Sequence, residues 1–141
     1  MKKSKVKNTS HRLLKFDKLS DMAIAVIKGS LWAVSISLIA ILLFAIIIRF
    51  TNIPDSFIMP INQIIKVFSI LIGTILASKI NPKNGLKMGF YIGILYTIVA
   101  YLVFSLLSQN FTFGTTNIID LVFAGIIGAI SGVFAVNISS R

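Results

Sequence analysis

The chain has 141 residues, of which 56% are hydrophobic and only 13% are charged, and its formal net charge is +10. A mean hydropathy of +0.92 lies far above that of water-soluble domains of this size, so the composition indicates an integral membrane protein. The absence of cysteine excludes disulfides, thiol catalysis and thiolate metal sites.

A basic tail, residues 1–21, comes first in the chain. Its Lys and Arg side chains predict contacts with anionic lipid headgroups on the cytoplasmic side of a membrane. Apolar residues at helical spacing, among them Leu13, Phe16 and Leu19, predict an interfacial amphipathic helix, and a partly disordered orientation signal is the alternative. No nucleic-acid-binding module accompanies the charge, so no nucleic acid is expected as a partner. The residues expected at the headgroups are Lys2, Lys3, Lys5, Lys7, Arg12, Lys15 and Lys18.

Four apolar segments follow within residues 22–141, and each has the roughly 20 residues that a helix needs to cross the hydrocarbon core. The segments are continuous rather than alternating, which favours helices over a β-barrel. The sequence therefore predicts an all-α, multi-pass membrane protein. The predicted spans are residues 27–48, 58–78, 88–108 and 118–138.

The distribution of charge between the spans predicts their orientation. Lys79, Lys83 and Lys87 lie between the second and third spans, and Arg141 ends the chain. The first connection sets Arg49 against an aspartate, and the third has no charge. Because cationic residues resist translocation, both termini are expected on the cytoplasmic side of the membrane.

The two halves of the chain resemble each other. At an offset of 60 residues Gly29 falls on Gly89, and at an offset of 55 residues Asn62 falls on Asn117 and Gly73 on Gly128. This predicts two tandem helical hairpins related by a parallel internal repeat. The alternative is a chance similarity between apolar segments of limited alphabet.

Small residues recur every fourth position in three of the spans. Such stripes let helix backbones approach closely in lipid, so they predict helix packing within the protein; a glycine-lined pore or a homodimer seam is the alternative. The residues are Ser69, Gly73, Ala77, Gly85, Gly89, Gly93, Ala124, Gly128 and Gly132.

Lys66 interrupts the second span with a full charge. The repeat aligns Asp120 with Ile65, so the two charges are expected at the same depth, where an ion pair would reduce the cost of each. Two alternatives remain: the Lys66 side chain snorkels to the nearer headgroups, or the two residues form a substrate or proton site.

Few of the other residues are of the types that bind metal ions or catalyse reactions. There is one histidine, no glutamate and four aspartates, and they form no metal-ligand cluster, carboxylate pair or activated nucleophile. The sequence predicts neither a cofactor nor an enzyme activity. It favours a non-catalytic membrane protein that acts through helix contacts, with itself or as an accessory of a membrane complex. The alternative is a small transporter or channel subunit that uses Lys66 and Asp120.

The stretch "NPKNGLKMGFYIGILY", together with "SILIGTILASK" before it and "GAISGVFAVN" after it, resembles the YrzE-like group. These are uncharacterised four-helix membrane proteins of Firmicutes-type bacteria. The resemblance covers roughly residues 27–138 and implies a four-helix fold with no activity to carry over. It also implies a gene neighbourhood with a small accessory subunit of the protein-export machinery.

Overall fold

A computed structural model of the protein describes residues 2–141, and this part of the chain is helical apart from three short connections and the last residues. The helices are α1 (Lys2–Phe50), α2 (Asp55–Ile80), α3 (Gly85–Ser108) and α4 (Thr115–Ser139). All four are long and apolar enough to cross a membrane. The prediction of four helices of membrane-spanning length and hydropathy is therefore confirmed.

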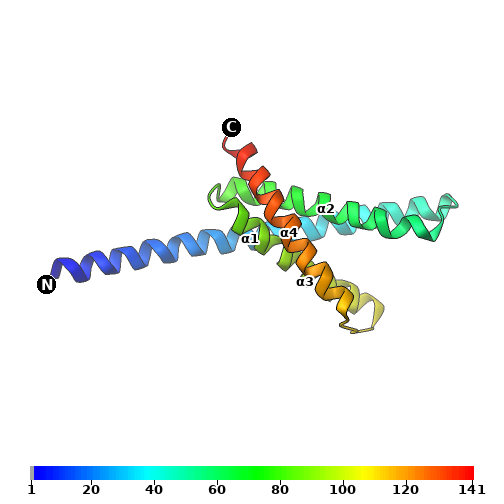
Figure 1. Cartoon of the computed structure of the whole chain (residues 1–141), viewed down its shortest axis with the longest axis horizontal. Coiled ribbons are helices and arrows are strands. Elements are labelled where there is room, and N and C mark those ends of the chain that lie inside the picture. The colour runs from blue at the N-terminus through cyan, green and yellow to red at the C-terminus, as the bar shows by residue number, and fades with distance from the viewer. Residues whose placement is uncertain (1) are drawn as a thin grey trace.

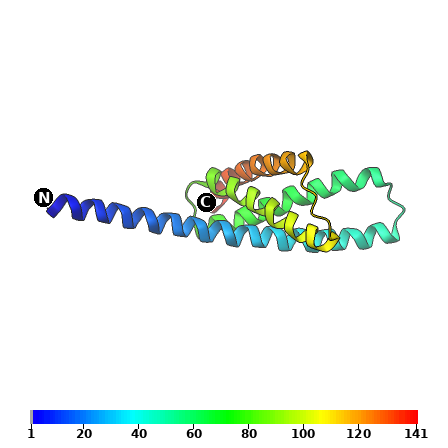
Figure 2. The same cartoon turned by 90° about the horizontal axis from the view of Figure 1, so that it is seen from below.

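The helices form two hairpins, α1–α2 and α3–α4, which cross obliquely (Figure 1). Besides the contacts within each hairpin, α2 packs on α4 and α1 on α3, with a smaller contact between α2 and α3. Both termini and the α2–α3 connection lie at one end, which we call the termini end (Figures 1 and 2). At the other end, the hairpin end, the two hairpins diverge, and the α3–α4 connection stops short of the α1–α2 connection.

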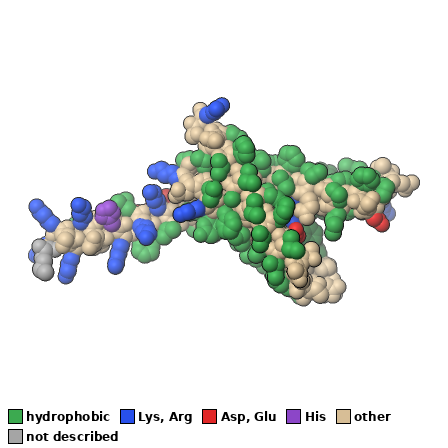
Figure 3. Space-filling view, viewed as in Figure 1, with side chains coloured by type: hydrophobic (Ala, Val, Ile, Leu, Met, Phe, Trp, Pro, Cys, Tyr) green, Lys and Arg blue, Asp and Glu red, His purple; other side chains and the backbone are tan. Residues whose placement is uncertain are grey.

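Helix α1 extends well beyond the bundle at the termini end (Figure 2). Its 49 residues correspond to a length of about 70 Å, more than twice the thickness of a hydrocarbon core. The helix continues without a break across residue 21, where the sequence suggested a boundary between tail and transmembrane domain. The cations expected at lipid headgroups all lie on this exposed extension, as do Leu13 and Phe16 (Figure 3).

Local sequence determines where the helices end. Pro54 precedes α2 with its φ at −61°, which suits the residue before a helix. Asn84 and Gln109, at the start and the end of α3, have left-handed backbones with φ of 56° and 54°. Asparagine tolerates this conformation well, and a left-handed residue commonly terminates a helix, as Gln109 does.

Within the α3–α4 hairpin, glycines bring the two backbones into contact. A Cβ atom added to Gly89 would collide with the carbonyl oxygen of Gly128, and one added to Gly128 would collide with that of Gly89. The same holds for Gly85 and Gly132. No larger side chain fits between these helices at their present separation.

The α1–α2 hairpin has the same kind of seam. A Cβ atom on Gly29 would lie 2.8 Å from Ala77 Cβ and 2.9 Å from the Gly73 carbonyl oxygen, and one on Gly73 would lie 2.7 Å from Ala33 Cβ. All nine residues expected in packing stripes are buried, so the structure places them between helices of this one chain. A matching stripe of small residues at the same four-residue spacing, absent from the predicted set, lies on α1: Ala25, Gly29, Ala33 and Ser37.

Hydroxyl groups join the two hairpins at the termini end. Ser78 of α2 is fully buried, and its Oγ lies 3.2 Å from the Ala135 carbonyl oxygen and 2.7 Å from Ser139 Oγ, both on α4. Buried polar contacts between helices are stabilising in lipid, where no water competes. The bundle is therefore closed at the termini end and open at the hairpin end.

Candidate functional site

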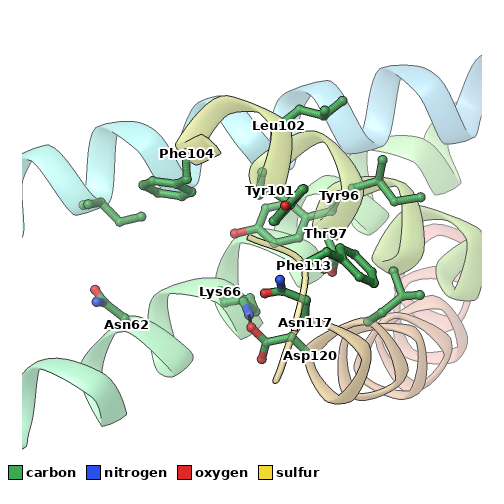
Figure 4. Close-up of a pocket in the computed structure, with 14 residues that line it drawn as sticks. Asn62, Lys66, Tyr96, Thr97, Tyr101, Leu102, Phe104, Phe113, Asn117 and Asp120 are labelled. Atoms are coloured by element: carbon green, nitrogen blue, oxygen red, sulfur yellow. Dashed lines mark ion pairs between the residues drawn. The ribbon is translucent and has the colours of Figure 1, made fainter. Parts of the chain in front are cut away.

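Lys66 and Asp120 meet where the two hairpins begin to diverge. Lys66 extends from α2 toward α4, and its Nζ lies 3.1 Å from Asp120 Oδ2 (Figure 4). The side chains are 20% and 35% exposed, so neither is fully enclosed by protein. Gln63, one helical turn before Lys66, lies with its Nε2 3.5 Å from the other carboxylate oxygen, a long hydrogen bond. The Lys66 side chain thus reaches across to α4 in this structure.

The pair lies near the hairpin end of the bundle. Asp120 comes five residues after the start of α4 and Lys66 eleven residues after the start of α2, or about 8 Å and about 16 Å along the helix axes. The oblique crossing of the hairpins compensates for this difference and brings the two side chains to one level. Both residues lie in the half of their helices nearer the hairpin end, and therefore below the headgroups in a membrane crossed by all four helices.

A cavity of about 520 Å³, which we call the hairpin cavity, adjoins the pair between the two hairpins. All four helices and the α3–α4 connection contribute to its wall, which is mostly apolar. Asn117 lies beside the ion pair, whereas Asn62 lies apart from it (Figure 4). Seven of the lining side chains are polar. They are Asn62, Lys66, Tyr96, Thr97, Tyr101, Asn117 and Asp120.

The α3–α4 connection is tied down beside this cavity. Asn117 Nδ2 donates to the Thr112 carbonyl oxygen at 3.1 Å, and Ser105 Oγ donates to that of Asn110 at 3.0 Å. The rings of Tyr101 and Phe113 meet edge to face with their centroids 5.6 Å apart. The connection therefore holds Phe113 at the cavity wall.

On its other side, Asp120 borders a groove between α2 and α4, which we call the α2–α4 groove. It has a volume of about 510 Å³ and is largely apolar. Gln63 and Asp120 are its polar residues, and they lie at one end of it. The apolar lining comes from Ile64, Val67, Phe68, Ile119, Phe123 and Ile127.

The free-energy cost of placing Lys66 and Asp120 in a membrane depends on the groups around them. In helix-insertion measurements, a lysine or aspartate near the middle of a membrane helix costs about 2.5 to 3.5 kcal/mol, and less toward the edge. Pairing compensates each charge, and Gln63 adds a donor for the carboxylate. The exposed parts of both side chains still face a cavity and a groove, so an additional polar or zwitterionic group there would find partners.

The sequence pattern drew attention to Lys66 and Asp120 but missed the polar residues around them. Asn62 and Asn117 fall on each other in the repeat, and both line the hairpin cavity. The repeat therefore contained a signal for both asparagines. Thr97 falls on Ser37 in the repeat. Tyr96 and Tyr101 gave no such signal, because aromatic and hydroxyl groups are common in packed helices.

Among residues 2–141, no three His, Cys, Asp or Glu side chains lie close enough to hold a metal ion. A protein family, described as a protein of unknown function (DUF3792), matches residues 22–135. The chain belongs to this family. The DUF3792 match covers the bundle from the last exposed turns of α1 to near the end of α4, and thus both Lys66 and Asp120. No curated protein and no solved structure matches the chain.

Proposed function

We propose that this DUF3792 protein is a non-catalytic membrane protein that acts through helix contacts with a second membrane protein, as an accessory of a membrane complex. The observation that carries the proposal is the α2–α4 groove, in which an apolar lining ends at two polar side chains, Gln63 and Asp120. A transmembrane helix of a partner would fill the apolar part. A polar side chain on that helix would reach Asp120, and such contacts between helices are stabilising in lipid.

The resemblance to the YrzE-like group of Firmicutes-type bacteria supports the same proposal. It implies a bacterial cytoplasmic membrane and a gene neighbourhood with an accessory subunit of the protein-export machinery. The positive charges at the termini end support an orientation with both termini in the cytoplasm (Figure 3).

Equivalent contacts in the two hairpins support a duplicated hairpin as the origin of the fold. Gly29 packs on Gly73 in the first hairpin, and their repeat partners, Gly89 and Gly128, pack on each other in the second. The same is true of the Gly29–Ala77 and Gly89–Gly132 contacts. A chance similarity of apolar segments has no reason to preserve which residues touch.

Site-specific photo-crosslinking in native membranes tests the proposed contact. A photo-reactive residue at Phe68 or Phe123, in the α2–α4 groove, should crosslink to one membrane protein, whereas the same residue at Leu42, an exposed position on α1 outside the groove, should not. Crosslinks at all three positions to the same mixture of proteins, or to none, would contradict the proposal. A crosslinked product of twice the chain mass would show that the groove binds a second copy of this chain rather than a different membrane protein.

A small transporter or channel subunit is the second candidate, because Lys66 and Asp120 line a cavity rather than a closed interface. In purified vesicles this candidate requires a proton or solute flux that is lost in both Lys66→Met and Asp120→Asn. A flux that persists in either variant excludes it.

A further inference from the structure

The hairpin cavity combines features that a lipid-facing surface does not need. Its wall has apolar side chains, with Ile41 and Leu102 among them, and it also has an ion pair with the amide of Asn117 beside it (Figure 4). Its volume of about 520 Å³ lies within the range of pockets that bind small molecules. An amphipathic ligand would satisfy both parts, with its polar end at Lys66 and Asp120 and its apolar end along the wall.

The charge of the cavity restricts the ligand further. Lys66 and Asp120 contribute one positive and one negative charge, so the site is neutral as a whole. A ligand with net charge would leave one charge without compensation in a low-dielectric region, which is costly. A zwitterion keeps the balance, since each of its charges meets the opposite charge of the pair.

The depth of the site indicates the source of such a ligand. Asp120 lies about 8 Å along α4 and Lys66 about 16 Å along α2 from the helix starts at the hairpin end, so the site falls within the leaflet that borders this end. The hairpins diverge toward this end (Figure 1), and the hairpin cavity has lining residues from both of them, which gives a lipid of the adjacent leaflet a route into it.

We propose that the hairpin cavity binds the headgroup of a zwitterionic phospholipid with a primary ammonium group, such as phosphatidylethanolamine. The Lys66 ammonium donates to a phosphate oxygen, and the ammonium of the lipid donates to the Asp120 carboxylate. The amide of Asn62 and the hydroxyl of Tyr101 line the same cavity and supply further hydrogen-bonding groups. The acyl chains leave along the apolar wall into the membrane.

Thermal unfolding of the purified full-length protein in detergent, with added lipids, tests the proposal. Phosphatidylethanolamine should raise the Tm by about 4 °C or more near saturation, phosphatidylcholine by less because its quaternary ammonium has no N–H donor, and phosphatidylglycerol least. An equal or larger shift with phosphatidylglycerol would overturn the assignment of a zwitterion. An equal shift with water-soluble glycerophosphoethanolamine would overturn the assignment of a lipid.

Variants connect the effect to this cavity. Lys66→Met combined with Asp120→Leu removes both charges at similar volume and should abolish the preference for phosphatidylethanolamine. Lys79→Met, a matched change on an exposed position of the same helix, should retain it. Thr97→Phe leaves the ion pair in place and fills part of the cavity, and it should also reduce the shift. An unchanged lipid preference in both cavity variants would refute the proposal, and native mass spectrometry of retained lipid gives an independent reading of the same result.

Discussion

At the residue scale, the position of Lys66 is explained by Asp120. The lysine occurs in an otherwise apolar span, where it would be costly alone, and the structure provides a carboxylate at 3.1 Å from the neighbouring helix. Replacing one partner leaves the charge of the other without an opposite charge beside it, whereas replacing both by apolar residues creates an apolar contact between α2 and α4. Pairs of this kind are often no more stable than well-packed apolar residues.

A double-mutant cycle measures this interaction. We expect Lys66→Leu and Asp120→Leu each to lower the free energy of unfolding in detergent, and the double variant to recover most of the loss, with a coupling of about 1 to 3 kcal/mol. Strictly additive effects, or a stabilising Lys66→Leu, would instead indicate that the lysine snorkels to the headgroups.

The sequence shows which residues of this site are unusual, but not how they are brought together. A charge in an apolar span and an internal repeat are both visible in the sequence, and together they predict a common depth for Lys66 and Asp120. The hairpin cavity is different, because it depends on the angle at which the hairpins cross. That angle follows from packing of α1 on α3 and of α2 on α4, which no local pattern encodes.

At the element scale, the glycine seams control how closely the helices approach. In the α3–α4 hairpin, Gly89 and Gly128 place backbone against backbone, and there is no room for a Cβ atom. By contrast, Gly114 lies in the α3–α4 connection, where an added Cβ would have no neighbour within 4 Å. The two environments provide a matched test of the same substitution.

We expect Gly89→Ala and Gly128→Ala each to lower the free energy of unfolding by about 1 to 3 kcal/mol, because the added methyl group forces the helices apart. Gly114→Ala should change it by less than about 0.5 kcal/mol. Chemical denaturation in mixed micelles gives these values. If all three variants unfold alike, α3 and α4 do not approach each other at these glycines.

The extension of α1 is a separate case, since its residues from Lys2 to Lys18 are exposed and the helix projects beyond the bundle there (Figure 2). Deleting residues 2–18 should therefore leave the Tm in detergent within about 2 °C of the parent. The same deletion should weaken binding of the detergent-solubilised protein to anionic lipid, because it removes seven cationic side chains. A large loss of thermal stability would show that the extension packs on the bundle.

Composition and periodicity predict the helices themselves with little ambiguity, since continuous apolar segments of this length have few other structures in a membrane. Their ends are less predictable. Helix α1 continues to Lys2 although charged residues replace apolar ones before residue 22, because Lys and Arg are good helix formers and no proline or glycine interrupts the segment.

For the whole molecule, the positive charges at the termini end predict that this end faces the cytoplasm. Reporter enzymes that are active only outside the cytoplasm should be inactive when fused after Lys2 or Arg141, and active when inserted between Gln109 and Thr116. The expectation rests on Lys79, Lys83 and Lys87, which share the side of the N-terminal extension. An active reporter at either terminus would show that the orientation is the opposite one. The hairpin cavity would then border the cytoplasmic leaflet instead of the outer leaflet.

The central claim is that the two hairpins close on each other at the termini end and diverge at the hairpin end. Because the chain has no cysteine, a disulfide between introduced cysteines reports on this arrangement directly. Ser78→Cys with Ser139→Cys, at positions whose hydroxyl oxygens lie 2.7 Å apart, should crosslink rapidly within one chain in native membranes. The control pair, Ser108→Cys with Ser139→Cys, places the thiols at opposite ends of the bundle and should remain reduced. Equal crosslinking of the two pairs, or none in the first, would contradict the arrangement on which both proposed sites depend.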